Sequence, residues 1–382
     1  MGKVLFEITD ELLETGLRGF PVGYCTTSRV DPEKGLFYRE KPISYFKSWD
    51  PEKVIHFLYS GQIDGFTQFN EQLKNRASLS PDTVAAICRL PREGHPMKLF
   101  SAALLLLGML EGKNDYHEDG LNLIAKIPHL TATVINFHAG WGETPPPDPA
   151  LGYMENFAEM LNVPSGDKKA LTEIFRLFNV LHYDHGGGNL STFVGKAIAS
   201  GKEDMYGSIS GAMCALAGPL HGKANQDALV FVQSLLKSVG GHFSEEAVEK
   251  ELRDRLARRD VIYGFGHAVL RQEDSRATVL YDLINADFPD NPLVKIVNLL
   301  RKVGPKVLKE NPKIADPYPN VDAVSGTALS AAGFGYPEYF TVLFGLSRSI
   351  GIVTQIIYER LEARGGKGTP IVRPKYIYRA IS

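Results

Sequence analysis

The chain has 382 residues, a formal net charge of −2 at pH 7 and three cysteines. This near-neutral balance excludes a global basic field of the kind that binds nucleic acid or an anionic membrane. The cysteines are isolated and odd in number, so they predict a reducing compartment and offer neither a disulfide framework nor a zinc site. The length and the 44% hydrophobic content allow a large core divided over two domains.

The sequence gives no signal for export or for membrane insertion. Its longest apolar run, 99–110, is too short to span a bilayer and predicts a buried helix. The first residues, MGKVLFEITDELLE, are acidic and lack both an apolar signal core and an Arg- and Ser-rich transit composition. We therefore expect a cytoplasmic protein.

The only extended structure that the sequence predicts lies near the N-terminus. In GYCTTSRVDPEKGLFYREKPI an Asp-Pro turn separates short aromatic and β-branched runs, which predicts a small hairpin. Helix starts follow at Asp50-Pro51 and Ser80-Pro81, where a capping residue precedes a proline at the first helical position. Further helices are predicted over 98–110, 129–141, 153–161 and 168–182.

The second half of the chain also has helical periodicity. Apolar residues between 228 and 239 recur at i, i+3, i+4 and i+7, and Ser244 caps EEAVEKELRDRLARR, which has acids first and arginines last. Asn291-Pro292 begins another helix, and 338–364 reads as one long helix ended by two glycines. The tail, PIVRPKYIYRA, predicts an extended arm. The predicted fold class is all-α with a minor N-terminal hairpin.

Two histidines on Gly-flanked turns, His185 and His221, lie on either side of a block rich in Gly, Ala and Ser. We expect His221 to begin a helix, where the dipole keeps its imidazole neutral and available as a hydrogen-bond donor. His267 follows Gly264-Phe265-Gly266, which exposes it. Further candidates are Arg271, Arg276, Asp322, Arg348 and Arg373.

Each candidate taken alone has a simpler explanation. Asp322 could be only the N-cap of the segment that follows it, and the arginines could be solvated surface charges. Taken together, the residues suit one reaction, because guanidinium groups bind carboxylates bidentately and neutral histidines stabilise an enolate or alkoxide oxygen. A carboxylate close to them can remove a proton next to a carbonyl. This predicts a carbon–carbon condensation that needs no metal and no redox cofactor.

These motifs resemble those of the citrate synthases. HYDHGGGN, LAGPLHGKANQ, GFGHAVLRQEDSRA, PNVDAVSG, FGLSR and VRPK occur in the order and at the spacing of that family, over roughly residues 54–375. GHPM, at 94–97, is a weaker upstream match. Gly187 and Phe265 depart from the family pattern, and Ser275 stands where proline is frequent, which predicts a less rigid loop before Arg276.

The resemblance implies an almost entirely helical fold in which a large and a small domain close over a cleft. By motif position, the large domain would comprise 1–222 and 327–382, and the small domain 223–326. The family resemblance also implies a homodimer, and dimers that pair further into hexamers are compatible with the sequence. The partners would be acetyl-CoA and oxaloacetate, with no nucleic acid and no membrane.

The resemblance also implies a role for each matched residue. His221 would hydrogen-bond the thioester oxygen of acetyl-CoA, Asp322 would remove the methyl proton, and His267 would polarise the oxaloacetate ketone. Further oxaloacetate-binding residues would be His185, Arg276, Arg348 and, from the other subunit, Arg373. CoA would be contacted by Arg271 and Lys313.

The implied reaction is the condensation of acetyl-CoA with oxaloacetate and the hydrolysis of citryl-CoA, at the entry to the tricarboxylic acid cycle. The nearest alternative is 2-methylcitrate synthase, which uses propionyl-CoA, because one methylene of pocket room changes binding by only about 1–3 kcal/mol. Citryl-CoA cleavage, as in ATP-citrate lyase, would need an ATP-grasp or CoA-ligase region that this sequence lacks. A further alternative is an inactive helical dimer that binds CoA or a dicarboxylate.

Overall fold

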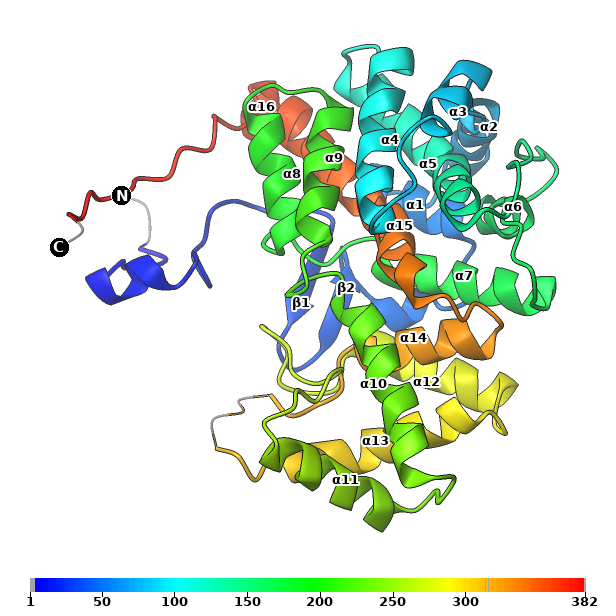
Figure 1. The fold of residues 1–382 in the computed structure, drawn as a ribbon. Coiled ribbons are helices and arrows are strands. Elements are labelled where there is room, and N and C mark those ends of the chain that lie inside the picture. Colours follow the sequence, from blue (N-terminus) through cyan, green and yellow to red (C-terminus); the bar gives the residue numbers. More distant parts are fainter. Residues whose placement is uncertain (1–3, 313, 315, 381–382) are drawn as a thin grey trace.

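The computed structural model describes residues 4–312, 314 and 316–380, and its architecture is almost entirely helical (Figure 1). In these residues one antiparallel sheet is present, with strands β1 Ser28–Asp31, β2 Gly35–Tyr38 and β3 Lys41–Pro42 in that order. At the β1–β2 turn, Oδ1 of Asp31 accepts hydrogen bonds from the backbone N–H groups of Glu33 and Lys34, both at 3.0 Å. The predicted all-α fold with a small N-terminal hairpin is confirmed.

Helices from the first 216 residues form one packed group, and a helix from the C-terminal part completes it. Their bounds are α1 Pro51–Ser60, α2 Phe66–Arg76, α3 Pro81–Ile87, α4 Pro96–Glu111, α5 Tyr116–Ala139, α6 Tyr153–Met160, α7 Lys168–His182, α8 Leu190–Ser200, α9 Met205–Leu216 and α15 Phe340–Ile357. All 18 residues of α15 are buried, because it packs against α5, α7, α8 and α9. Any polar side chain on α15 is therefore held inside the protein.

A second group of helices lies below the first in Figure 1, with the hairpin between the two. Its members are α10 Ala224–Val239, α11 Glu245–Ala257, α12 Ser275–Asp287, α13 Pro292–Leu308 and α14 Asp322–Ala331. These helices pack mainly on one another. The domain boundaries at 222 and 326 stay a prediction, and α14 runs through the second of them.

The predicted helix starts are confirmed where capping residues mark them. The Ser80 Oγ accepts from the backbone N–H of Thr83 at 3.2 Å, and the Ser244 Oγ accepts from that of Ala247 at 3.1 Å. Asn291 likewise caps α13, which begins with a proline. Local chemistry favours these boundaries, since each bond satisfies an N–H group that the first helical turn leaves free.

The single long helix predicted over 338–364 is wrong. Helix α15 ends at Ile357, a π-helical turn follows over Tyr358–Glu362, and α16 Ala363–Gly366 contains left-handed backbone at Arg364 and Gly365. By length and composition the stretch 337–366 could cross a membrane, but its most apolar 18-residue window is entirely buried inside the protein. That burial identifies it as a core helix.

The block rich in Gly, Ala and Ser was not predicted to be helical, and it forms α8 and α9. Gly195 of α8 lies so close to α9 that a side chain there would approach Ala212 Cβ to 3.1 Å and Ile352 of α15 to 3.0 Å. Close approach of the three helices is thus the reason for the small residues. Tertiary packing outweighs the low helix propensity of glycine here.

The two ends of the chain leave the body on the same side (Figure 1). Residues 367–380 form no helix or strand, as predicted for an arm. The arm is fixed by a hydrogen bond from the Val372 N–H to Ser200 Oγ at 2.9 Å and by an ion pair of 2.8 Å between Arg379 and Glu14. The first contact ties the start of the arm to α8, and the second ties its end to the N-terminal segment.

Replacement of Phe334 by alanine should lower the free energy of unfolding by about 3–5 kcal/mol. Phe334 is fully buried, and its ring lies 5.3 Å from that of Phe175 and 5.5 Å from that of Tyr336, so truncation leaves a cavity between both. Denaturant titration followed by circular dichroism measures the loss. Ile63→Ala, at a position that is 47% exposed, is the control and should change stability by less than about 0.5 kcal/mol; an equal loss in both variants would contradict the prediction.

Candidate active site

His185 lies in the turn that follows α7, and its position is fixed by the buried carboxylate of Asp184. One oxygen of Asp184 accepts from the His185 N–H and from the Gln355 Nε2 of α15, both at 2.8 Å, and the other accepts from the Thr27 hydroxyl. The Nε2 of His185 is buried and has no partner in the described structure. The backbone of His185 is thus fixed, and its unbonded ring nitrogen can bind a ligand oxygen.

His267 is presented by the loop before α12. Its Nδ1 accepts hydrogen bonds from the backbone N–H groups of Val269 at 3.0 Å and Leu270 at 2.9 Å. Since Nδ1 serves as acceptor, this arrangement assigns the hydrogen of the neutral ring to Nε2. The ring lies 5.1 Å from that of His185, edge to face, so the structure brings the two predicted histidines together.

Two buried guanidinium groups adjoin these histidines. Arg276, the second residue of α12, is 4% exposed and forms a bidentate pair with Asp274, with Nε at 3.0 Å and Nη2 at 2.6 Å. Arg348, on α15, is 2% exposed and donates from Nε to the carbonyl oxygen of His182 at 3.2 Å. Burial, with Arg276 nearby, lowers the pKa of Arg348 to about 10.

The histidines of the site are held neutral. Burial lowers the pKa of His267 to about 4, and the positive charge of Arg276 acts in the same direction. For His185, burial and the charges of Arg276 and Arg348 place the pKa well below its ordinary value. Neutral rings are hydrogen-bond donors on one nitrogen only, which suits stabilisation of a developing negative oxygen.

His221 lies in the turn between α9 and α10, and the expectation that it begins a helix is wrong. Helix α10 starts three residues later, at Ala224. The pKa of His221 is nevertheless lowered to about 4, by burial first and then by Arg348 rather than by a helix dipole. Its Nε2 accepts from the Ser191 N–H at 3.3 Å, which favours the hydrogen on Nδ1 and leaves that nitrogen as the donor.

Asp322 is the first residue of α14 and caps nothing with its side chain, so the alternative that it is only an N-cap is wrong. In the part of the chain that the structure describes, no hydrogen bond reaches its carboxyl oxygens. Burial raises the pKa of Asp322 to about 6, and the charges of Arg276 and Arg348 oppose that rise. The carboxylate therefore shares one electrostatic cluster with the arginines.

The cluster suits an anion better than a metal ion. By distance alone, His185, His267 and Asp274 could hold a metal, since their ligand atoms lie within 4.8 Å of one another. Both oxygens of Asp274 are already bonded to Arg276, however, and two guanidinium charges act on this space. Guanidinium groups bind carboxylates, so a small dicarboxylate is the ligand that these charges favour.

Arg271 and Arg373 are exposed, unlike the other predicted residues that the structure describes. Arg271 is exposed and donates from Nη1 to carbonyl oxygens of its own loop, that of Leu270 at 2.7 Å. Arg373 is exposed on the C-terminal arm. Lys313 lies outside the described residues.

Sequence reasoning missed the groups that position the site. Asp274 and Asp184 stand within the quoted motifs, and Asp274 has a local signal, because an aspartate two residues before Arg276 can cap the helix that holds it. No local signal marks Tyr38, whose hydroxyl donates to the Val180 carbonyl at 2.8 Å and accepts from the Asp184 N–H at 3.3 Å.

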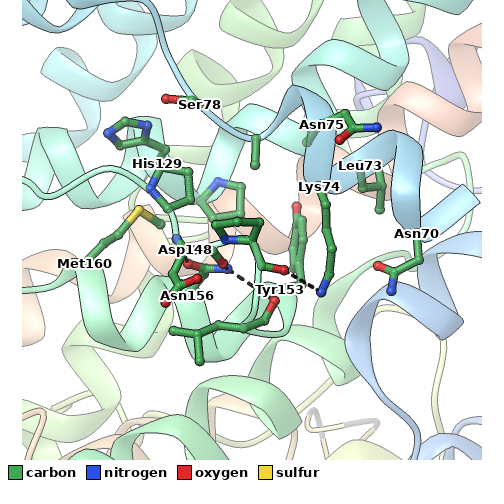
Figure 2. A pocket seen from close by; sticks show the side chains of 16 residues that line it. Asn70, Leu73, Lys74, Asn75, Ser78, His129, Asp148, Tyr153, Asn156 and Met160 are labelled. Atoms are coloured by element: carbon green, nitrogen blue, oxygen red, sulfur yellow. Dashed lines mark hydrogen bonds between the residues drawn. The ribbon is translucent and has the colours of Figure 1, made fainter.

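A separate cavity of about 190 Å³ lies between α2, α5, α6 and the proline-rich loop over 143–152 (Figure 2). None of the predicted site residues lines it. Its polar groups bind the surrounding backbone: Lys74 Nζ donates to the Pro149 carbonyl at 2.8 Å, and the Tyr153 hydroxyl donates to the Ile124 carbonyl at 2.6 Å (the first of these is drawn in Figure 2). The polar groups of this cavity are therefore used to hold the loop. We place the chemistry in the cluster of histidines and arginines instead.

The family model for the citrate synthase C-terminal domain matches residues 16–375. The chain belongs to the citrate synthase family. It is 35% identical to citrate synthase 4, mitochondrial, of Arabidopsis thaliana, over 98% of this chain and 84% of that protein. It is 34% identical to mitochondrial citrate synthase of Xiphias gladius, over 97% of this chain and 83% of that protein.

Solved structures of the family share the fold. The citrate synthase of Thermotoga maritima is 25% identical, with a TM-score of 0.81 over 97% of this chain and 96% of that one. A citrate synthase of Thermoplasma acidophilum, solved as a ternary complex with carboxymethyl coenzyme A and oxaloacetate, is 23% identical with a TM-score of 0.81, over 96% of each chain. The helical fold implied by the motifs is confirmed.

The expectation of a cytoplasmic location is wrong by these comparisons, because the curated relatives are mitochondrial citrate synthases. That expectation depended on the composition of the first fourteen residues. The composition of those fourteen residues describes that segment alone, whereas the mitochondrial relatives match almost the whole chain.

Asp322→Asn should raise the free energy of unfolding at pH 7.5 by about 1–3 kcal/mol. The folded pKa lies above the ordinary value, so the folded state binds the proton more tightly and loses stability as pH rises through the window from about 4 to about 6. The asparagine avoids that loss. Denaturant titrations at pH 7.5 and pH 4 measure it, with exposed Asp64→Asn as the control for the change in charge. A gain that is equal at both pH values would contradict the assignment.

Proposed function

We propose that this protein condenses acetyl-CoA with oxaloacetate and hydrolyses the resulting citryl-CoA to citrate and CoA. The observation that supports this most directly is Asp322, a carboxylate with a pKa raised to about 6, no hydrogen bond to its oxygens from the described residues, and two buried arginines nearby. Such a group is ionised at neutral pH and is a stronger base than an exposed aspartate. Its membership of the citrate synthase family agrees with this chemistry.

In the proposed first step, the Asp322 carboxylate takes a proton from the methyl group of acetyl-CoA. The electron pair of that C–H bond forms the enolate, and the charge moves to the thioester oxygen. His221, with its hydrogen assigned to Nδ1, donates a hydrogen bond to this oxygen. A neutral imidazole suits this task because it has a hydrogen to donate and no charge to lose.

In the second step the enolate carbon attacks the ketone carbon of oxaloacetate, and the C=O electron pair moves to its oxygen. His267 donates from Nε2 and protonates the alkoxide as it forms, and the proton that Asp322 took from the methyl group restores the neutral imidazole, so both residues return to their starting state. Arg276, Arg348 and His185 hold the oxaloacetate, and Arg373 completes the set from the other subunit. Water then cleaves the thioester of citryl-CoA and releases citrate and CoA. These steps use groups of the protein alone, so the proposal includes no metal or cofactor.

Asp322→Asn should lower the rate of CoA release by about 10²–10⁴-fold, because the amide accepts no proton. Oxaloacetate binding, measured by calorimetry, should change less than about threefold, since both arginines remain. Release of the free thiol from acetyl-CoA in the presence of oxaloacetate measures the rate. Near wild-type turnover would exclude Asp322 as the base.

The same assay separates the competing functions when it is run on the wild-type protein with acetyl-CoA and propionyl-CoA in parallel. Faster release from acetyl-CoA supports the proposal, whereas a clear preference for propionyl-CoA would replace it with 2-methylcitrate synthesis. Binding of oxaloacetate without CoA release from either thioester would identify an inactive binding protein.

We further propose that the working unit is a homodimer in which Arg373 acts in the site of the other subunit. The arm that holds it is exposed and leads away from the body of its own chain (Figure 1). Arg373→Ala and Arg276→Ala should each be inactive alone, and mixed dimers should recover up to about a quarter to a half of the activity, because one of their two sites is intact. Activity measured after the two variants are unfolded and refolded together tests this, with each variant refolded alone as the control. No recovery on mixing would contradict a shared site.

A further inference from the structure

The β1–β2 hairpin, with its flanking Thr27, is bonded at its base to the turn that holds His185. Ser28 Oγ accepts from the Gly186 N–H at 2.7 Å, and the Thr27 hydroxyl donates to Asp184. Tyr38, which pairs with Ser28 in the sheet, is fully buried and bridges Val180 and Asp184 through its hydroxyl. The base of the hairpin thus sets the backbone on both sides of His185.

The other end of the same hairpin is bonded to the loop and helix that hold Arg276. The carbonyl oxygen of Pro32, in the β1–β2 turn, accepts from the Arg271 N–H at 2.9 Å. The Leu36 N–H, on β2, donates to the Ser275 Oγ at 3.1 Å across 239 positions of sequence. Ser275 is the first residue of α12 and stands between Asp274 and Arg276.

The contact between the hairpin and Ser275 is too close for any residue but glycine on the hairpin side. Gly35 has a φ of +86°, and a Cβ there would lie 2.4 Å from Ser275 Oγ and 2.7 Å from Ser275 Cβ. A backbone that approaches this closely transmits a displacement of one partner to the other. Ser275 also supplies what a proline at this position lacks, a hydroxyl acceptor for the hairpin.

We propose that the hairpin is a positioning element that fixes the distance between the two halves of the dicarboxylate site, and that Ser275 is its positioning residue on the Arg276 side. The inference rests on the proposed binding of oxaloacetate by His185 and Arg276. Arg276 is bonded to Asp274 both through its guanidinium group and through its backbone N–H, at 2.9 Å. The hydrogen bond at Ser275 therefore locates the whole Asp274–Arg276 unit relative to His185.

Ser275→Ala should raise the KM for oxaloacetate by about 3- to 10-fold, the value of one hydrogen bond. The KM for the acyl-CoA and the thermal midpoint should stay close to wild type, because the change affects the dicarboxylate site only. Ser28→Ala, which releases the other end, should give the same selective effect. Ser244→Ala is the matched control: it also removes one hydrogen bond between a serine Oγ and a backbone N–H, but on α11, and should leave the KM for oxaloacetate unchanged.

The double variant Ser28→Ala/Ser275→Ala distinguishes a shared element from two local contacts. If the hairpin links the two ends, release of the second end adds little. The KM for oxaloacetate of the double variant should then match, within about twofold, that of the single variant with the higher KM. Effects on KM that multiply would show independent contacts and overturn the proposal. An unchanged KM for oxaloacetate in Ser275→Ala, with an active wild-type enzyme, would overturn it without affecting the proposed function.

Hydrogen exchange on the wild-type protein gives a test that does not depend on variants. A ligand held between His185 and Arg276 should slow exchange in peptides covering 27–38, because binding and hairpin order stabilise each other. Oxaloacetate is the probe, and peptides from α11 are the reference. Protection of the site loops without protection of 27–38 would overturn the proposal, whereas binding of oxaloacetate without any condensation activity would count against the proposed function alone.

Discussion

The burial of two guanidinium groups in one small space is the constraint on which the rest of the site depends. Arg276 is paired with Asp274, whereas Arg348 has a carbonyl oxygen and the face of Phe344, 4.8 Å away, around it. Burial and these charges together lower the pKa values of the histidines, and the charges limit the rise in that of Asp322. Removal of charged groups from water is costly without partners. A carboxylate that enters this space could pair with the guanidinium group of Arg348.

The fold provides this burial through elements that are themselves fully enclosed. Helix α15 holds Arg348 because every one of its residues is inside the protein, and Asp184 is held by α15 and by the hairpin together. The price is that the Nε2 of His185 is buried without a partner among the residues that the structure describes. An unsatisfied buried group costs about 1–3 kcal/mol, which a ligand oxygen can offset. The site is organised before its substrate arrives.

The sequence predicted what depends on neighbouring residues and motifs. Caps at Ser80, Ser244 and Asn291 mark helix starts. The motifs around His185 and His267 predicted that both histidines belong to one site, and their rings lie 5.1 Å apart. Helices α8 and α9 were missed because their glycines and serines have low helix propensity in isolation and are selected by packing against α15. The contact between Leu36 and Ser275 joins residues 239 positions apart, and nothing local to either one signals it.

Asp322 shows why position alone does not decide the role of a carboxylate. At the start of a helix an aspartate is expected to be stabilised in its charged form by the helix dipole, which lowers its pKa. Here the pKa is raised to about 6, so burial outweighs both the dipole and the two nearby arginines. Burial without the arginines would raise the pKa of Asp322 further. The same guanidinium charges that favour a dicarboxylate therefore keep the neighbouring base ionised.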